Sequence, residues 1–133
     1  MHKYLANETS KLYFARVKIT GKWQIAEAEL AGKPLAKKDL AGMTLELDET
    51  SYQLIDKMVI DSGIIEPVAG ARPAALRITG VFGPNKGKTF YCIYRFEKQD
   101  LIMCYNLGKG PPPASFVTQE QSLLYLVRYR RLK

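Results

Sequence analysis

The fold is decided by residues 89–106, which read Thr89-Phe-Tyr-Cys-Ile-Tyr-Arg-Phe96, Glu97-Lys-Gln-Asp100 and Leu101-Ile-Met-Cys-Tyr-Asn106. Aromatic and β-branched residues fill the two outer runs, and the polar tetrapeptide between them supplies a tight turn. The stretch therefore predicts an antiparallel β-hairpin. With Lys98-Gln99 at its tip, the facing pairs are Phe96 with Leu101, Tyr94 with Met103, and Cys92 with Tyr105.

This register also decides whether the two cysteines can meet. It places Cys92 and Cys104 on opposite faces of the hairpin, where no disulfide can join them. A slip of one residue would bring them opposite each other, because side chains alternate between faces with period two. Two cysteines are in any case too few for a disulfide scaffold, and buried thiols are the expected state.

The same alternation extends outward along the chain, with turn residues every ten or so positions. A long first strand begins at Trp23 and changes face midway, and Asp61-Ser62-Gly63 is predicted to be a turn. The other predicted strands cover residues 43–47, 52–54, 57–60, 64–65, 75–79 and 123–131. No predicted helix is long enough to cover a sheet face. The expected fold is all-β, an antiparallel up-and-down barrel of about eight strands, with a tight sandwich as the alternative.

One domain accounts for the 133 residues. Residues 21–133 are predicted to form the barrel domain, and residues 1–20 an N-terminal lead-in segment. Within that segment, residues 11–20 fit either a helix or an extra strand.

Composition excludes several classes of function. The only histidine is His2, so histidine-based zinc sites and catalysis by a buried imidazole lose their main ingredient. No carboxylate pair stands in a context that selects it as an acid and base. We therefore expect no enzymatic activity, no catalytic residue, no metal and no cofactor.

No apolar run approaches the length of a membrane-spanning helix, and the first ten residues lack a hydrophobic stretch of signal-peptide type. As written, the chain is expected to be cytoplasmic. It would be secreted or periplasmic if a leader has been removed.

Charge is distributed unevenly. Residues 1–66 carry nine Lys and Arg against ten Asp and Glu, net −1, whereas residues 67–133 carry eleven against three, net +8. Arg128-Tyr-Arg-Arg131 and Lys133, with Arg95, Lys86 and Lys88, could form a basic patch interleaved with tyrosines, as in single-strand nucleic-acid binders. No RNA-binding motif accompanies it, so nucleic acid is an unlikely partner and a solvated basic face is favoured.

The segment Gly83-Pro-Asn-Lys-Gly-Lys-Thr89 imitates a phosphate-binding loop. It has three residues between its glycines where four are required, and a strand is predicted after it instead of a helix. We interpret it as a turn joining two strands.

Gly21-Lys22-Trp23 at the start of the first strand resembles the Gly-x-Trp signature of lipocalins. That resemblance implies that Trp23 closes one end of the barrel. It also implies that an arginine of the last strand, Arg128 or else Arg130, packs over the indole.

A longer set of motifs is similar to a bacterial lipocalin-like domain family first catalogued in planctomycetes. It covers residues 21–131 and comprises Gly21-Lys-Trp23, Glu29-Leu-Ala-Gly-Lys-Pro34, Asp39-Leu-Ala-Gly-Met43, Gly83-Pro-Asn-Lys-Gly-Lys-Thr89, Ile93-Tyr94 and Asp100-Leu-Ile-Met-Cys104. The family has no established activity, and the likeness implies only binding of small hydrophobic ligands.

Alternation along the predicted strands points one set of side chains into the barrel. The inward-facing side chains are aromatic or apolar, and belong to Tyr52, Phe90, Tyr94, Phe96, Tyr105, Met43, Met103 and Leu54. Tyr52, Phe90, Tyr94, Phe96, Met103 and Tyr105 are the candidate ligand-binding residues, with Arg95 as a less favoured, outward-facing candidate.

The predicted function is non-catalytic binding of a small apolar or amphipathic molecule in the barrel. The alternative is an interaction module with a filled barrel and a basic outer face that contacts a protein, nucleic acid or anionic surface.

Overall fold

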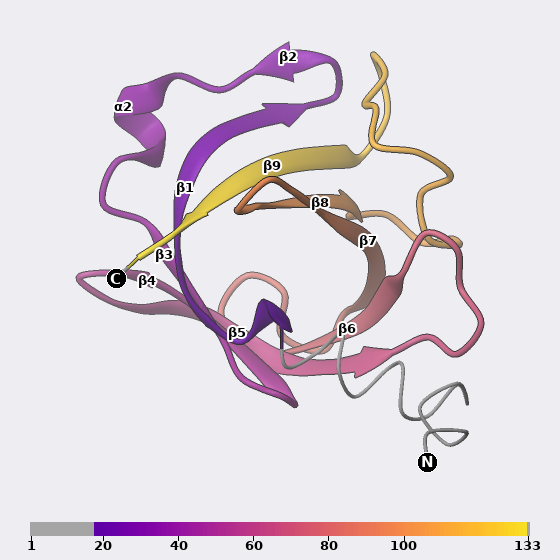
Figure 1. The fold of residues 1–133 in the computed structure, drawn as a ribbon, viewed down its shortest axis with the longest axis horizontal. Coiled ribbons are helices and arrows are strands. Elements are labelled where there is room, and N and C mark those ends of the chain that lie inside the picture. The colour runs from indigo at the N-terminus through magenta and orange to yellow at the C-terminus, as the bar shows by residue number, and fades with distance from the viewer. Residues whose placement is uncertain (1–17, 133) are drawn as a thin grey trace.

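Eight antiparallel strands close into a barrel in the computed structural model, which describes residues 18–132 (Figure 1). Each strand pairs with the next, and the last pairs with the first. The predicted all-β, up-and-down barrel is confirmed. Its strands are β1 (Gly21–Leu30), β3 (Thr44–Leu47), β4 (Ser51–Asp56), β5 (Met58–Pro67), β6 (Ala75–Phe82), β7 (Thr89–Glu97), β8 (Asp100–Asn106) and β9 (Leu124–Arg131).

Two short elements lie outside the barrel wall. The two-residue strand β2 (Lys33–Pro34) extends the sheet beside β1, and the single-turn helix α2 (Lys37–Leu40) follows it (Figure 1). Within the described part of the chain, no helix is long and apolar enough to cross a membrane. The helix or strand predicted over residues 11–20 falls mainly outside the described residues.

The hairpin β7–β8 has the register that the sequence predicted. Phe96 pairs with Leu101, and the predicted pairings follow down the ladder to Cys92 and Tyr105. Cys92 belongs to the core inside the barrel, whereas Cys104 packs outside it against Ile93. The two thiols are not joined, because alternation sends them to opposite faces of the hairpin. Both are buried, because an apolar cluster covers each face.

The predicted change of face in the first strand is also confirmed. The pairing of β1 with β9 shifts between Ile25 and Glu27, where a bulge places one extra residue in the strand. Ile25 and Ala28 are consequently both buried, although they stand three positions apart.

The turn predicted at Asp61-Ser62-Gly63 is wrong, because β5 runs without interruption through these residues. Gly63 serves close packing here instead of chain reversal. A Cβ at this position would lie 2.1 Å from the carbonyl oxygen of Thr79 and 2.7 Å from Cε1 of Tyr52. Only glycine lets a neighbouring strand and ring approach so closely.

Part of the barrel wall is buried on both faces. Ala75, Ile93 and Cys104 point outward and form a second apolar cluster. The loops 68–74 and 107–123 cover this cluster, contributing Val68 and Phe116 among others. The wall made by β6, β7 and β8 therefore lies between two cores.

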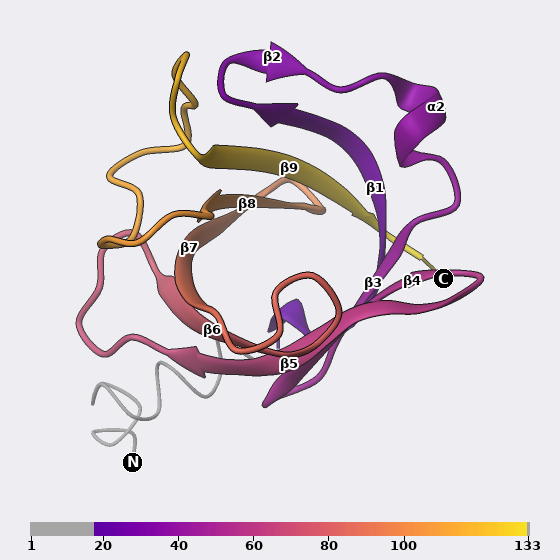
Figure 2. The ribbon, with the colours of Figure 1, turned by 180° about the vertical axis from the view of Figure 1, so that it is seen from behind.

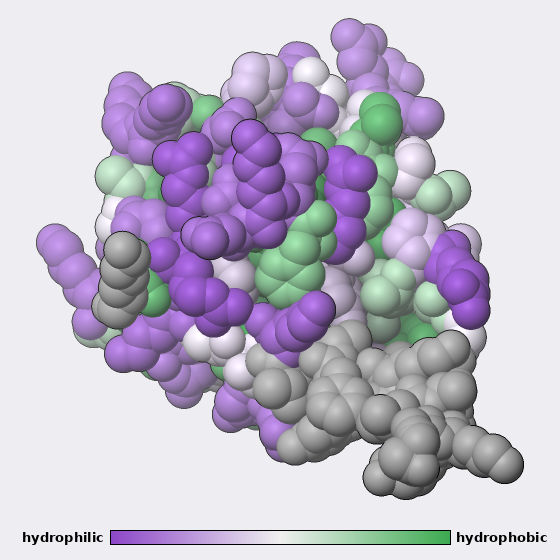
Figure 3. Space-filling view, in the orientation of Figure 1, coloured by the Kyte–Doolittle hydropathy of each residue, from purple (hydrophilic) through white to green (hydrophobic). Residues whose placement is uncertain are grey.

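One end of the barrel is closed by Trp23, whose side chain is fully buried. Its Nε1 donates a hydrogen bond of 2.9 Å to the carbonyl oxygen of Ile19, which is also fully buried. Phe96 lies beside the indole with a ring-centroid separation of 6.3 Å. Seen from the side shown in Figure 1, the described surface is mostly hydrophilic, with apolar areas near the middle and at the upper right of the view (Figure 3).

The arginine over the indole is Arg131, so the prediction of Arg128 or Arg130 is wrong. The Arg131 guanidinium carbon lies 4.2 Å from the centroid of the Trp23 ring. Trp23 and Arg131 are direct partners in the β1–β9 ladder, whereas Arg128 stands opposite Glu27. Because side chains alternate, Arg131 shares its face with the inward Tyr129, and Arg128 points outward.

Gly21 completes this closure. Its φ is 134°, in the region that favours glycine, and a Cβ there would come within 2.6 Å of Arg131 Nη1. Arg131 also donates two hydrogen bonds of 2.9 Å, to the carbonyl oxygens of Thr20 and Lys18. The Gly-x-Trp sequence thus has a local physical reason: glycine leaves room for the cation that covers the tryptophan.

Candidate ligand cavity

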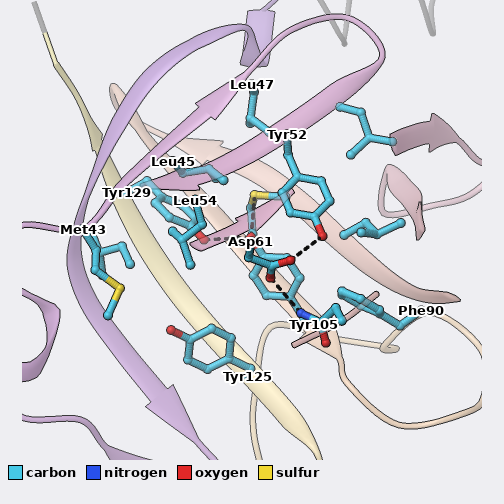
Figure 4. Close-up of a pocket in the computed structure, with 15 residues that line it drawn as sticks. Met43, Leu45, Leu47, Tyr52, Leu54, Asp61, Phe90, Tyr105, Tyr125 and Tyr129 are labelled. Atoms are coloured by element: carbon cyan, nitrogen blue, oxygen red, sulfur yellow. Dashed lines mark hydrogen bonds between the residues drawn. The ribbon is translucent and has the colours of Figure 1, made fainter. Parts of the chain in front are cut away.

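A cavity occupies the barrel interior beyond Trp23, toward the opposite end, where the β6–β7 turn lies across part of the opening (Figure 2). It is partly open and has a volume of about 110 Å³. Apolar and aromatic side chains dominate its lining (Figure 4). The lining residues are Ile25, Met43, Leu45, Leu47, Tyr52, Leu54, Asp61, Ile65, Ile78, Asn85, Phe90, Met103, Tyr105, Tyr125 and Tyr129.

One polar group in the cavity is centred on Asp61, which points inward from β5 (Figure 4). The Tyr52 hydroxyl donates a hydrogen bond of 3.0 Å to Asp61 Oδ1. Asn85, from the β6–β7 turn, donates one of 2.8 Å from Nδ2 to Asp61 Oδ2. Burial and the nearby Asp61 carboxylate raise the pKa of Tyr52, so this phenol stays protonated at neutral pH.

A second polar group consists of three tyrosines. The hydroxyls of Tyr105 and Tyr129 share a hydrogen bond of 2.7 Å, and the rings of Tyr105 and Tyr125 stack at 5.7 Å. Burial raises the pKa of all three phenols above the ordinary value. The Tyr125 hydroxyl has no hydrogen-bond partner among residues 18–132, although a buried tyrosine hydroxyl usually finds one.

Four of the six predicted ligand-binding residues line this cavity: Tyr52, Phe90, Met103 and Tyr105. The structure does not bring the other two, Tyr94 and Phe96, into it. Both lie further along β7 toward the closed end, where Tyr94 is buried in the core. Phe96 is 37% exposed beside Trp23. Whether any of the six binds a ligand stays a prediction.

Sequence reasoning missed the polar side of the cavity. Asp61 and Asn85 stand in segments of turn-like composition. Only the pairing of β5 with β4, in which Asp61 stands opposite the cavity-lining Leu54, shows that Asp61 points inward. Tyr125 and Tyr129 had a usable signal, because Tyr125-Leu-Val-Arg-Tyr129 alternates with the same period as the other strands. The arginines of the same segment suggest a surface role instead, and in the sequence their charge is a stronger signal than the alternation of the two tyrosines.

Two arginines of the basic patch considered from the sequence pair with carboxylates. Arg128 forms ion pairs with Asp100 at 2.9 Å, with Glu27 at 3.8 Å and with Glu97. Arg95 lies over the ring of Phe116, 4.7 Å from its centroid, and pairs with Glu97 at 3.4 Å. Neighbouring carboxylates thus balance the charges of Arg128 and Arg95.

Two lysines of that patch are separated from its arginines. Lys86 and Lys88 belong to the β6–β7 turn, at the opposite end of the barrel from Arg131. That turn joins two strands, as predicted. Its backbone hydrogen bonds, such as Gly87 N to Gly80 O at 3.0 Å, fold it back on β6. Because a strand follows, the helix N-terminus of a phosphate-binding loop is missing at this position.

The described residues contain no group of three or more His, Cys, Asp or Glu side chains placed to hold a metal ion. The apolar lining of the cavity can exclude water from an apolar surface, and Asp61 and the tyrosines offer hydrogen bonds. No family model, curated protein or solved structure matches the chain.

Proposed function

We propose that the chain is a non-catalytic domain of the bacterial lipocalin-like family and binds a small apolar or amphipathic molecule inside its barrel. The observation that carries the proposal is the cavity itself. A partly open space of about 110 Å³ is lined mainly by apolar and aromatic side chains, with a few converging polar groups. Small-molecule sites in proteins share this composition.

The volume limits the size of the ligand. An apolar cavity of about 150 Å³ holds one benzene molecule. The cavity therefore suits a single ring or a short chain, unless a longer molecule extends through the opening. Burial of apolar surface, worth about 25 cal/mol per Å², would supply the attraction.

The same groups argue against catalysis. Every tyrosine hydroxyl that lines the cavity has a raised pKa and is protonated at neutral pH, so none is a ready base or nucleophile. The Asp61 carboxylate already accepts hydrogen bonds from Tyr52 and Asn85. These contacts suit a residue that orients a ligand.

Native mass spectrometry of the freshly purified protein, compared with its denatured mass, tests the proposal. We expect an adduct of defined mass that dissociates on denaturation. Leu54 and Gln53 offer a matched pair of variants, because Leu54 lines the cavity and its neighbour Gln53 is exposed on the outer face. Leu54→Trp should abolish the adduct, and Gln53→Trp should keep it.

An adduct that survives Leu54→Trp unchanged would place the ligand elsewhere and contradict the proposal. A clean apo mass, together with no stabilisation by single-ring compounds at millimolar concentration, would favour an interaction module whose barrel has no ligand.

A further inference from the structure

We propose that the cavity selects a small organic cation, a protonated amine or quaternary ammonium group attached to an apolar body of about one ring. This inference rests on the proposed function, because it specifies the ligand of the same cavity. It is carried by the placement of Asp61 among aromatic rings.

Asp61 is the only charged residue among the fifteen that line the cavity. Among the described residues, no Lys or Arg forms an ion pair with it, and its two hydrogen-bond donors, Tyr52 and Asn85, are neutral. A partly buried carboxylate without a counterion is costly. A ligand cation would supply the missing charge.

The carboxylate also has room for such a ligand. An ionised carboxylate offers about four lone-pair positions, and Tyr52 and Asn85 occupy two of them. The remaining positions can accept hydrogen bonds from an ammonium group. Bonds between oppositely charged groups are shorter and stronger than neutral ones.

Five aromatic rings line the same cavity, and electron-rich rings attract cations. Tyr105 and Tyr125 stack with an interplanar angle of 28° and present a continuous aromatic surface. The free hydroxyl of Tyr125 adds an oxygen that can accept a hydrogen bond. The rings are those of Tyr52, Phe90, Tyr105, Tyr125 and Tyr129.

An anionic ligand has no partner in this lining, since none of the lining residues is Lys, Arg or His. The formal net charge of +7 includes the −1 of Asp61, so the positive excess belongs to residues outside the cavity lining. At physiological ionic strength, charges more than about 8 Å away are largely screened. The carboxylate at contact therefore decides the sign of the ligand.

Three probes with the same ring test the inference by isothermal titration calorimetry at neutral pH: benzylamine, which is protonated, benzyl alcohol, which is neutral, and benzoate. We expect benzylamine to bind at least about tenfold more tightly than benzyl alcohol, equivalent to about 1.4 kcal/mol. Benzoate should show no binding.

The outcomes distinguish this inference from the proposed function. Equal affinity for benzylamine and benzyl alcohol would overturn cation selection and leave the binding cavity intact. Binding of benzoate at the affinity of benzylamine would overturn it as well. If none of the probes bound, both proposals would fail.

Asp61→Asn keeps the shape of the side chain and removes its charge, so the preference for benzylamine should fall to about one. Asp56→Asn makes the same change of net charge on an exposed position of β4 outside the cavity lining, and should keep the preference. A preference that persisted in Asp61→Asn would overturn the assignment to Asp61. If that variant fails to fold, the comparison of the three probes on the unmodified protein still decides.

Discussion

Replacing Arg131 with methionine tests how the closed end of the barrel is held. The substitution removes the guanidinium that lies 4.2 Å from the Trp23 ring centroid, together with its hydrogen bonds to Thr20 and Lys18. Methionine keeps an unbranched apolar side chain over the indole. The change therefore isolates the charge and the donors from the packing.

The expected loss can be built from these contacts. A cation over an aromatic face at an exposed site is worth about 0.5–1 kcal/mol. Each hydrogen bond to a carbonyl contributes about 0.5–1.5 kcal/mol net, and we take the lower half of that range because Arg131 is exposed. The sum is about 2 kcal/mol of unfolding free energy.

Urea unfolding followed by fluorescence and by far-ultraviolet circular dichroism measures this loss. Trp23 is the only tryptophan, so its emission reports on the closed end itself. With an m-value of roughly 1–3 kcal/mol/M, the midpoint should fall by about 1 M. Arg131→Lys should recover only part of the loss, because an ammonium group lacks the planar fork that reaches both carbonyls.

Arg130→Met is the matched control. Arg130 stands next to Arg131 on β9, but its side chain is 67% exposed. Its one ion pair with a described residue is long, with Nε 3.9 Å from Asp100 Oδ2. This variant should lose less than about 0.5 kcal/mol. The reasoning would be refuted if the two methionine variants had equal stability, since net charge alone would then explain the effect.

Three further predictions concern the interior. Burial raises the pKa of Tyr105, Tyr129 and Cys92, and raises that of Cys104 to about 11. The folded state therefore stabilises the protonated, neutral form of all four groups. The free energy of unfolding should therefore be constant below about pH 8.5 and should fall as the pH rises through the tyrosine range near 10. Urea unfolding at a series of pH values measures this dependence. A flat profile would contradict the burial of these groups. Both cysteines should resist a thiol reagent at pH 8 and react in urea; rapid labelling of the folded protein would contradict their placement. Gly63→Ala should lower the free energy of unfolding by an amount near the upper end of the range of about 1–3 kcal/mol, because the new Cβ would overlap the Thr79 carbonyl. Thermal or urea unfolding measures this loss. A variant as stable as the parent would show that β5 and β6 can move apart.

The parts of the fold that the sequence predicted correctly rest on local signals. The register of β7–β8 follows from a short polar turn and strict alternation, so the order of residues alone pairs Tyr94 with Met103. The bulge near Ala26 left a visible change in the spacing of buried residues. Such signals involve neighbours within one hairpin or one strand, where geometry leaves few alternatives.

The errors came from positions whose role depends on distant parts of the chain. Asp61-Ser62-Gly63 has turn composition, and its strand conformation follows from the packing of Gly63 against Thr79 and Tyr52. The choice of Arg131 over Arg128 depends on the pairing of the first strand with the last. The polar half of the cavity was hidden for the same reason, because Asp61 meets Asn85 only in the folded barrel.

The pairing of β1 with β9 has a consequence for how the protein is made. Arg131 and the Lys18 carbonyl that it bonds are separated by 113 positions in sequence. During synthesis on the ribosome, the edge of β1 that pairs with β9 stays uncovered until nearly the whole domain has been translated. Folds that depend on such distant contacts form slowly, and an uncovered strand edge can pair with another chain. The emerging β1 edge is consequently where we expect a chaperone to be needed most.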